Sequence, residues 1–125
     1  MVNHQRPVNL DLGTMKFPPM AIVSILHRLS GLILFLLLPV ILYLLNLSLK
    51  TPESFTQVKM LTEHPYYRFI LLCFGSAFIY HILAGIRHML MDLGLGETLH
   101  AGKRNAYLVM LLALVLSVLL GVWLW

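Results

Sequence analysis

The sequence has few charged residues for its length. They make up 11% of the 125 residues, against roughly a quarter in ordinary soluble domains. Apolar residues make up 59%, and the mean hydropathy is +0.85. A soluble domain of this size would expose much of that apolar surface to water, so most soluble folds are excluded. The same composition excludes intrinsic disorder.

The sequence has a single cysteine, Cys73. One thiol cannot form an internal disulfide, a Cys-x-x-Cys-His haem attachment, a thiolate iron–sulfur site or a multi-cysteine zinc site. Any metal is therefore expected to be held mainly by histidine, of which there are six.

Basic residues outnumber acidic ones by nine to five, for a formal net charge of +4. They form no cluster or stripe, and no aromatic residues alternate with them, so no nucleic-acid partner is expected. Most lie at the ends of apolar runs, whereas Arg28 and Arg87 lie within such a run or at its edge.

Three long apolar runs predict an all-α integral membrane protein with three transmembrane helices. Each run has at least the ~20 residues that a helix needs to cross a bilayer, and none has a polar stripe that could face water. The runs cover residues 20–49, 69–91 and 106–125. The two connections are too short for a separate soluble domain, so residues 1–125 form a single membrane-anchor domain. Pro39 is expected to kink the first span.

The distribution of lysine and arginine predicts the orientation. Six lie on the N-terminal side of the membrane and three on the other. The first set is Arg6, Lys16, Arg28, Arg87, Lys103 and Arg104, and the second is Lys50, Lys59 and Arg68. The positive-inside rule then places the N-terminus in the cytoplasm and the C-terminus outside. The first 20 residues lack the character of an organelle transit peptide, so a bacterial inner membrane is expected.

Polar residues interrupt two of the spans at helical spacing. In the first, Ser24 and Arg28 lie four residues apart on one face, which Gly31 continues. In the second, the same spacing recurs in His81, Gly85 and His88. A glycine in such a face permits close approach of a neighbouring helix or of a flat ligand.

Depth in the membrane distinguishes the histidines. At about 1.5 Å per residue, His81 lies roughly 16 Å from the cytoplasmic end of its span, whereas His27 and His88 lie only about 9 and 6 Å deep. A midplane imidazole is either an axial haem ligand or a hydrogen-bonding partner of a neighbouring helix, and spacing alone does not exclude the second. A second axial ligand is expected from a partner subunit, and the shallower histidines suit haem propionates or a polar ligand head.

Ser24 and Arg28 together offer a hydroxyl and a fixed cation. Such a pair can hold a carbonyl oxygen, as in a quinone head, and stabilise the negative charge that it gains on reduction. Two other interpretations stay open. The serine can bond its own helix backbone, and Arg28 and Arg87 can extend to phospholipid headgroups, which is favoured for Arg87. Because these polar side chains would otherwise face lipid, a partner chain is expected.

Three segments resemble a known family, the cytochrome b subunits of succinate dehydrogenase, which are membrane anchors of respiratory complex II. The segments are RPVNLDL at 6–12, P-x4-SILHRLSG at 19–31 and HILAGIRHMLMDLG at 81–94. The resemblance covers nearly the whole chain. It implies a complex with a flavoprotein, an iron–sulfur subunit and a second three-helix anchor, with one haem b shared by the anchors. Succinate would be oxidised at the flavin, so this chain is not itself catalytic for succinate.

The resemblance also assigns roles to individual residues. Ser24 and Arg28 fall on ubiquinone-binding positions, and His81 falls on the axial haem iron position. His27, Arg28 and His88 fall near the haem propionates or the quinone pocket. The alternatives are a fumarate reductase anchor, which runs the same chemistry in reverse, and a non-redox membrane assembly or transport subunit.

Overall fold

The computed structural model describes residues 16–125, and within this part every regular element is a helix. The helices are α1 (Pro19–Ser48), α2 (Pro52–Glu63), α3 (Pro65–Asp92) and α4 (Leu99–Leu124). Three of them, α1, α3 and α4, are long and apolar enough to cross a membrane, which confirms the predicted all-helical class and its three candidate spans. The motif at residues 6–12 lies outside the described residues.

Helix α2 was not predicted, since its residues were expected to be a loop. Thr51 begins the helix with a capping box, in which its side chain accepts a hydrogen bond from the Ser54 backbone N–H and Ser54 bonds back to Thr51. Pro52 occupies the first helical turn, where its missing N–H costs nothing. Hydrophobicity alone does not detect such a helix, because local capping rather than burial defines its start.

The starts of α3 and α4 also differ from the expected bounds. Helix α3 begins at Pro65 instead of residue 69, with the His64 side chain accepting from the Tyr66 N–H. Helix α4 begins at Leu99 instead of residue 106, after Thr98 accepts from the Ala101 N–H. Both extensions contain polar residues, Arg68 in α3 and His100, Lys103, Arg104 and Asn105 in α4. An apolar run therefore marks the lipid-crossing part of a helix and not its full length.

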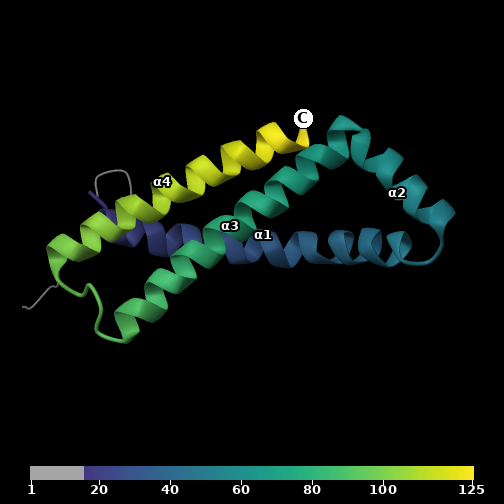
Figure 1. Ribbon diagram of the computed structural model, residues 1–125. Coiled ribbons are helices and arrows are strands. Elements are labelled where there is room, and N and C mark those ends of the chain that lie inside the picture. Colours follow the sequence, from purple (N-terminus) through teal and green to yellow (C-terminus); the bar gives the residue numbers. More distant parts are fainter. Residues whose placement is uncertain (1–15) are drawn as a thin grey trace, which may run out of the picture.

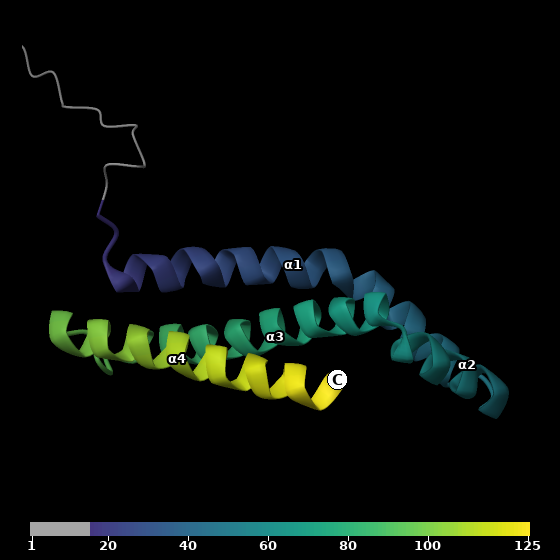
Figure 2. The same cartoon turned by 90° about the horizontal axis from the view of Figure 1, so that it is seen from above.

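The three long helices lie against one another and alternate in direction (Figures 1 and 2). The start of α1, the end of α3 and the start of α4 lie at one end of the bundle, whereas α2 and the C-terminus lie toward the other. Figure 1 shows that α3 crosses α1 at an angle. Figure 2 shows α1 bending toward its C-terminal end. Pro39 lies inside this helix, where a proline is expected to introduce a kink.

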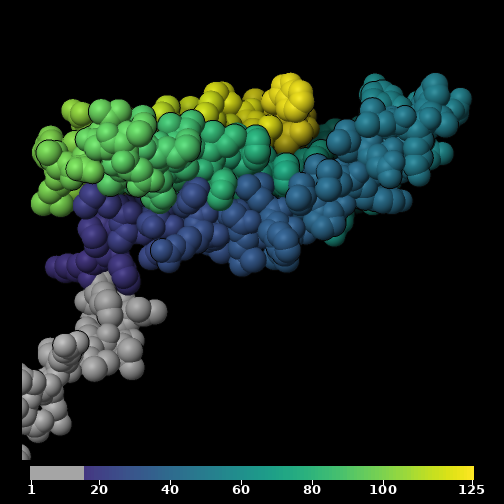
Figure 3. Space-filling view, turned by 90° about the horizontal axis from the view of Figure 1, so that it is seen from below, coloured from purple at the N-terminus to yellow at the C-terminus, as the bar shows by residue number. Residues whose placement is uncertain are grey.

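The buried core is small and made of small residues. Val23, Ala84, Ala106 and Val109 form one cluster where α1, α3 and α4 meet. Small side chains let helix backbones approach closely in a membrane. Figure 3 shows that the molecule is elongated and that α2 lies at one end of it. Most large apolar side chains are exposed. Such a surface suits lipid and partner helices.

Candidate functional site

Three histidines from α1 and α3 form one cluster. The rings of His27 and His81 stack with centroids 4.1 Å apart and an interplanar angle of 19°. The ring of His88 meets His27 edge-on, with centroids 5.2 Å apart. The sequence singled out all three residues, and the structure brings them together.

Two glycines make room for the stacked rings. A Cβ at Gly31 of α1 would lie 3.1 Å from Cε1 of His81, which is on α3. A Cβ at Gly85 of α3 would lie 3.4 Å from Nε2 of His27, which is on α1. Each helix thus offers a glycine to the histidine of the other. The sequence predicted that a glycine would permit a neighbouring helix or a flat ligand to approach closely. In the structure, a histidine ring of the neighbouring helix lies close to each glycine.

The expectation that His81 lies alone at its depth is wrong. Counting residues from the helix ends separated His27 from His81 by about 7 Å. That count assumes parallel helices with level ends, whereas α1 and α3 cross (Figure 1). The crossing brings the two rings into contact.

The hydrogen bonds of His81 favour one tautomer. Its Nδ1 lies 3.1 Å from Ser30 Oγ and 3.3 Å from the His27 carbonyl oxygen. A carbonyl oxygen only accepts, and the Ser30 hydroxyl donates its proton to that same carbonyl at 2.7 Å. Nδ1 is therefore the donor that suits both neighbours, which leaves the lone pair of Nε2 available.

A cavity of about 420 Å³ lies beside the cluster and is lined by all three histidines. Its other walls are apolar or glycine: Ile82, Gly85, Ile86 and Met89. Nε2 of His27 is buried and has no hydrogen-bond partner among the described residues. A buried nitrogen without a hydrogen bond costs folding free energy. A polar group bound in this cavity would therefore stabilise the cluster.

Ser24 lines a second recess at the same end of the bundle, of about 320 Å³. Arg87, His88 and Asp92 contribute its polar walls, and Met20 and Met91 its apolar ones. Arg28, four residues further along α1, is exposed and does not line this recess. Ser24 and His88 therefore line one recess, whereas Arg28 is exposed outside it.

Arg87 does not extend to the lipid surface, contrary to the favoured interpretation. It is only 6% exposed, and its Nη2 donates to the Gly102 carbonyl oxygen at 3.4 Å. Its Nε is buried and unpaired within the described residues. Gly102 is also buried, and a Cβ there would lie 2.6 Å from Met20 Sδ. The missing side chain lets α4 pack closely at this junction, which covers the arginine.

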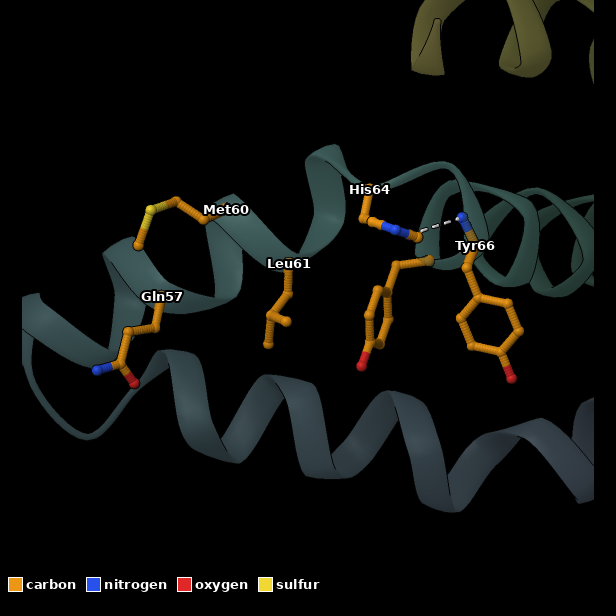
Figure 4. Close-up of a pocket in the computed structure, with 6 residues that line it drawn as sticks. Gln57, Met60, Leu61, His64 and Tyr66 are labelled. Atoms are coloured by element: carbon orange, nitrogen blue, oxygen red, sulfur yellow. Dashed lines mark hydrogen bonds between the residues drawn. The ribbon is translucent and has the colours of Figure 1, made fainter.

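A further recess lies toward the opposite end, between α2 and the start of α3 (Figure 4). It has a volume of about 560 Å³ and includes Tyr66 and Tyr67, which pack edge to face. Nearby, the Arg68 guanidinium lies 6.0 Å from the Trp125 ring centroid. These aromatic side chains suit a membrane–water interface. The histidine cluster does not reach them.

Comparison with known proteins gives consistent matches along the chain. The family described as "Succinate dehydrogenase/Fumarate reductase transmembrane subunit" matches residues 2–120. The chain is 44% identical to the succinate dehydrogenase cytochrome b556 subunit of Coxiella burnetii, over 99% of this chain and 100% of that protein. It is 30% identical to the cytochrome b556 subunit of Rickettsia typhi, over 97% of this chain and 94% of that one. A third such subunit, from Paracoccus denitrificans, is 30% identical over 91% and 88%.

These matches agree with the three apolar helices and with the resemblance carried by the motifs. They identify the chain as a multi-pass membrane protein of the succinate dehydrogenase cytochrome b type. The chain belongs to the family of succinate dehydrogenase/fumarate reductase transmembrane subunits.

Proposed function

We propose that this chain anchors succinate dehydrogenase in the membrane, holds one b-type haem together with a second anchor subunit, and forms part of the ubiquinone site. The observation that carries the proposal is the histidine cluster, in which the hydrogen bonds of His81 leave its Nε2 free. Neutral imidazole with a free nitrogen is a common axial donor to haem iron.

The residues of the cluster fit a haem. His81 would supply the axial nitrogen, and the unpaired Nε2 of His27 would gain a polar partner such as a propionate. His88 and Arg28 would assist there. When bound, the haem supplies a one-electron redox centre. The cavity lined by the three histidines also has apolar walls, formed by Ile82, Ile86 and Met89, against which the haem would pack.

The second axial ligand belongs to the partner in this proposal. The rings of His27 and His81 are in face-to-face contact at 4.1 Å, so no iron fits between them. His27 therefore does not act as the opposite ligand in this arrangement. A second anchor packed over the exposed apolar surface of α1 and α3 would supply the other histidine.

The quinone site is proposed to form at Ser24 and Arg28. The Ser24 hydroxyl, in its recess with His88, can donate a hydrogen bond to a quinone carbonyl oxygen. The exposed Arg28 guanidinium can stabilise the negative charge that this oxygen gains on reduction. Its exposure fits a site completed by the iron–sulfur subunit, which would deliver electrons from the flavoprotein.

A fumarate reductase anchor is the nearest alternative, because the matching family includes such subunits. The names of the similar proteins favour succinate dehydrogenase. A non-redox assembly or transport subunit would require none of the histidine geometry.

Purification of the chain from bacterial inner membranes tests the proposal. A flavoprotein, an iron–sulfur subunit and a second small membrane subunit are expected to co-purify. The reduced-minus-oxidised visible spectrum of the complex is expected to show a b-type haem. A colourless preparation without a flavoprotein would instead support the non-redox alternative.

The orientation is proposed to be N-terminus inside and C-terminus outside, from the six-to-three distribution of lysine and arginine. A reporter enzyme that folds only outside the cytoplasm is expected to be active when fused after Trp125. The same reporter inserted after Gly94, between α3 and α4, is the matched control and should be inactive. Activity of a cytoplasm-specific reporter after Trp125 would reverse the orientation.

A further inference from the structure

We propose that Ser30 is a positioning residue that fixes the tautomer and orientation of His81 and thereby tunes the haem reduction potential. The inference rests on the proposed ligation of haem iron by His81. Ser30 lies within the motif at 19–31, but no chemical role follows from its place in the sequence.

The Ser30 hydroxyl joins two helices through one atom. It donates to the His27 carbonyl oxygen of its own helix at 2.7 Å, and it lies 3.1 Å from Nδ1 of His81 on α3. A serine that bonds only its own helix backbone is common in membrane helices. Here the Ser30 hydroxyl donates its proton within α1. The lone pairs of Ser30 Oγ therefore remain free to accept a hydrogen bond from Nδ1–H of His81.

The position is also shielded from solvent. Ser30 is 5% exposed, and next to it Gly31 admits the His81 ring at close range. Water therefore cannot readily replace the hydroxyl. The His27 carbonyl, at 3.3 Å, is a longer second acceptor for the same N–H. Ser30 is thus the nearer of the two groups that hold Nδ1 protonated.

A hydrogen bond at the remote ring nitrogen of an axial histidine changes the electron density at the metal. An acceptor at Nδ1–H raises the basicity of Nε2, which stabilises ferric more than ferrous iron. Loss of the acceptor is expected to favour reduction, in which the iron takes one electron from the titrant. Removal of one neutral hydrogen bond corresponds to a change of about fivefold in the reduction equilibrium constant. For one electron this is an upward shift of about 40 mV.

The test is a potentiometric titration of the haem in the purified complex. Ser30→Ala is expected to raise the midpoint potential by about that amount and to change the ferric low-spin electron paramagnetic resonance signal. Ser30→Cys keeps a weak acceptor of similar size and is expected to lie between Ala and the parent. If the alanine variant loses its haem, the midpoint potential of the Ser30→Cys variant alone tests the role of Ser30. Ser117→Ala, on α4, is the matched control and should titrate like the parent.

The outcomes separate this inference from the proposed function. Parental potentials in both the Ser30→Ala and the Ser30→Cys complexes would overturn the role of Ser30, while haem ligation by His81 would stand. An unaltered haem in a His81→Leu complex would overturn the ligation itself. A raised potential in the Ser30 variants and not in Ser117→Ala supports the inference.

Discussion

Substitution of leucine for His81 is expected to abolish the b-type haem spectrum of the assembled complex. Leucine removes the nitrogen that we propose as the haem ligand and leaves an apolar side chain in a cavity that His27 and His88 continue to line. The measurement is a reduced-minus-oxidised spectrum together with electron paramagnetic resonance of the oxidised iron. Because a haem shared by two anchors, as proposed, would help to hold them together, the complex is also expected to dissociate more readily.

His88→Leu is the matched control for this substitution. His88 belongs to the same cluster but meets His27 edge-on, so its loss should at most shift the spectrum. A full low-spin signal in the His81→Leu complex would contradict the assignment. His27 would then be the next candidate, because its Nε2 is buried and has no hydrogen-bond partner among the described residues.

Substitution of leucine for Arg28 is expected to slow quinone reduction by about 100-fold or more, since a donor to a developing oxyanion contributes about that much. Ser24→Ala should impair the same step. Succinate oxidation with an artificial soluble acceptor should stay largely intact in both variants, because the proposed function places the flavin in another subunit. Steady-state assays with the two acceptors, on the same preparations, measure the difference.

Arg104→Leu is the control for charge at this end of the molecule. Arg104 is exposed on α4 and does not line the recess that contains Ser24, so its loss should leave quinone kinetics unchanged. If Arg28→Leu and Ser24→Ala both reduce quinone at the parental rate, the proposed quinone site is elsewhere.

The membrane-spanning architecture is predictable from sequence because long apolar runs have few structural alternatives. The ends of the helices are harder to predict from sequence, as the unexpected helix α2 and the early starts of α3 and α4 show. At these ends, side chains such as Thr51 and Thr98 satisfy backbone N–H groups, and this effect is independent of hydrophobicity. A search for proline preceded by threonine would have detected α2.

The three histidines of the candidate site were predictable from the sequence, but their geometry was not. The spacing of His81 and His88 placed them on one face, yet the contact of His81 with His27 depends on the crossing of two helices. The burial of Arg87 depends on the approach of α4 at Gly102. Ser30 had no distinguishing signal, because its role depends on an atom 51 residues away.

The reciprocal contacts of Gly31 with His81 and of Gly85 with His27 have a consequence for helix register. Sliding or rotating α1 along α3 would drive a ring into a backbone or remove its neighbour. The two contacts together therefore restrict both translation and rotation of this helix pair. Positions 31 and 81, like positions 85 and 27, are expected to tolerate substitution only jointly, with non-additive effects on stability. Helix packing within this one chain thus sets the arrangement of the imidazole rings before a partner subunit is added.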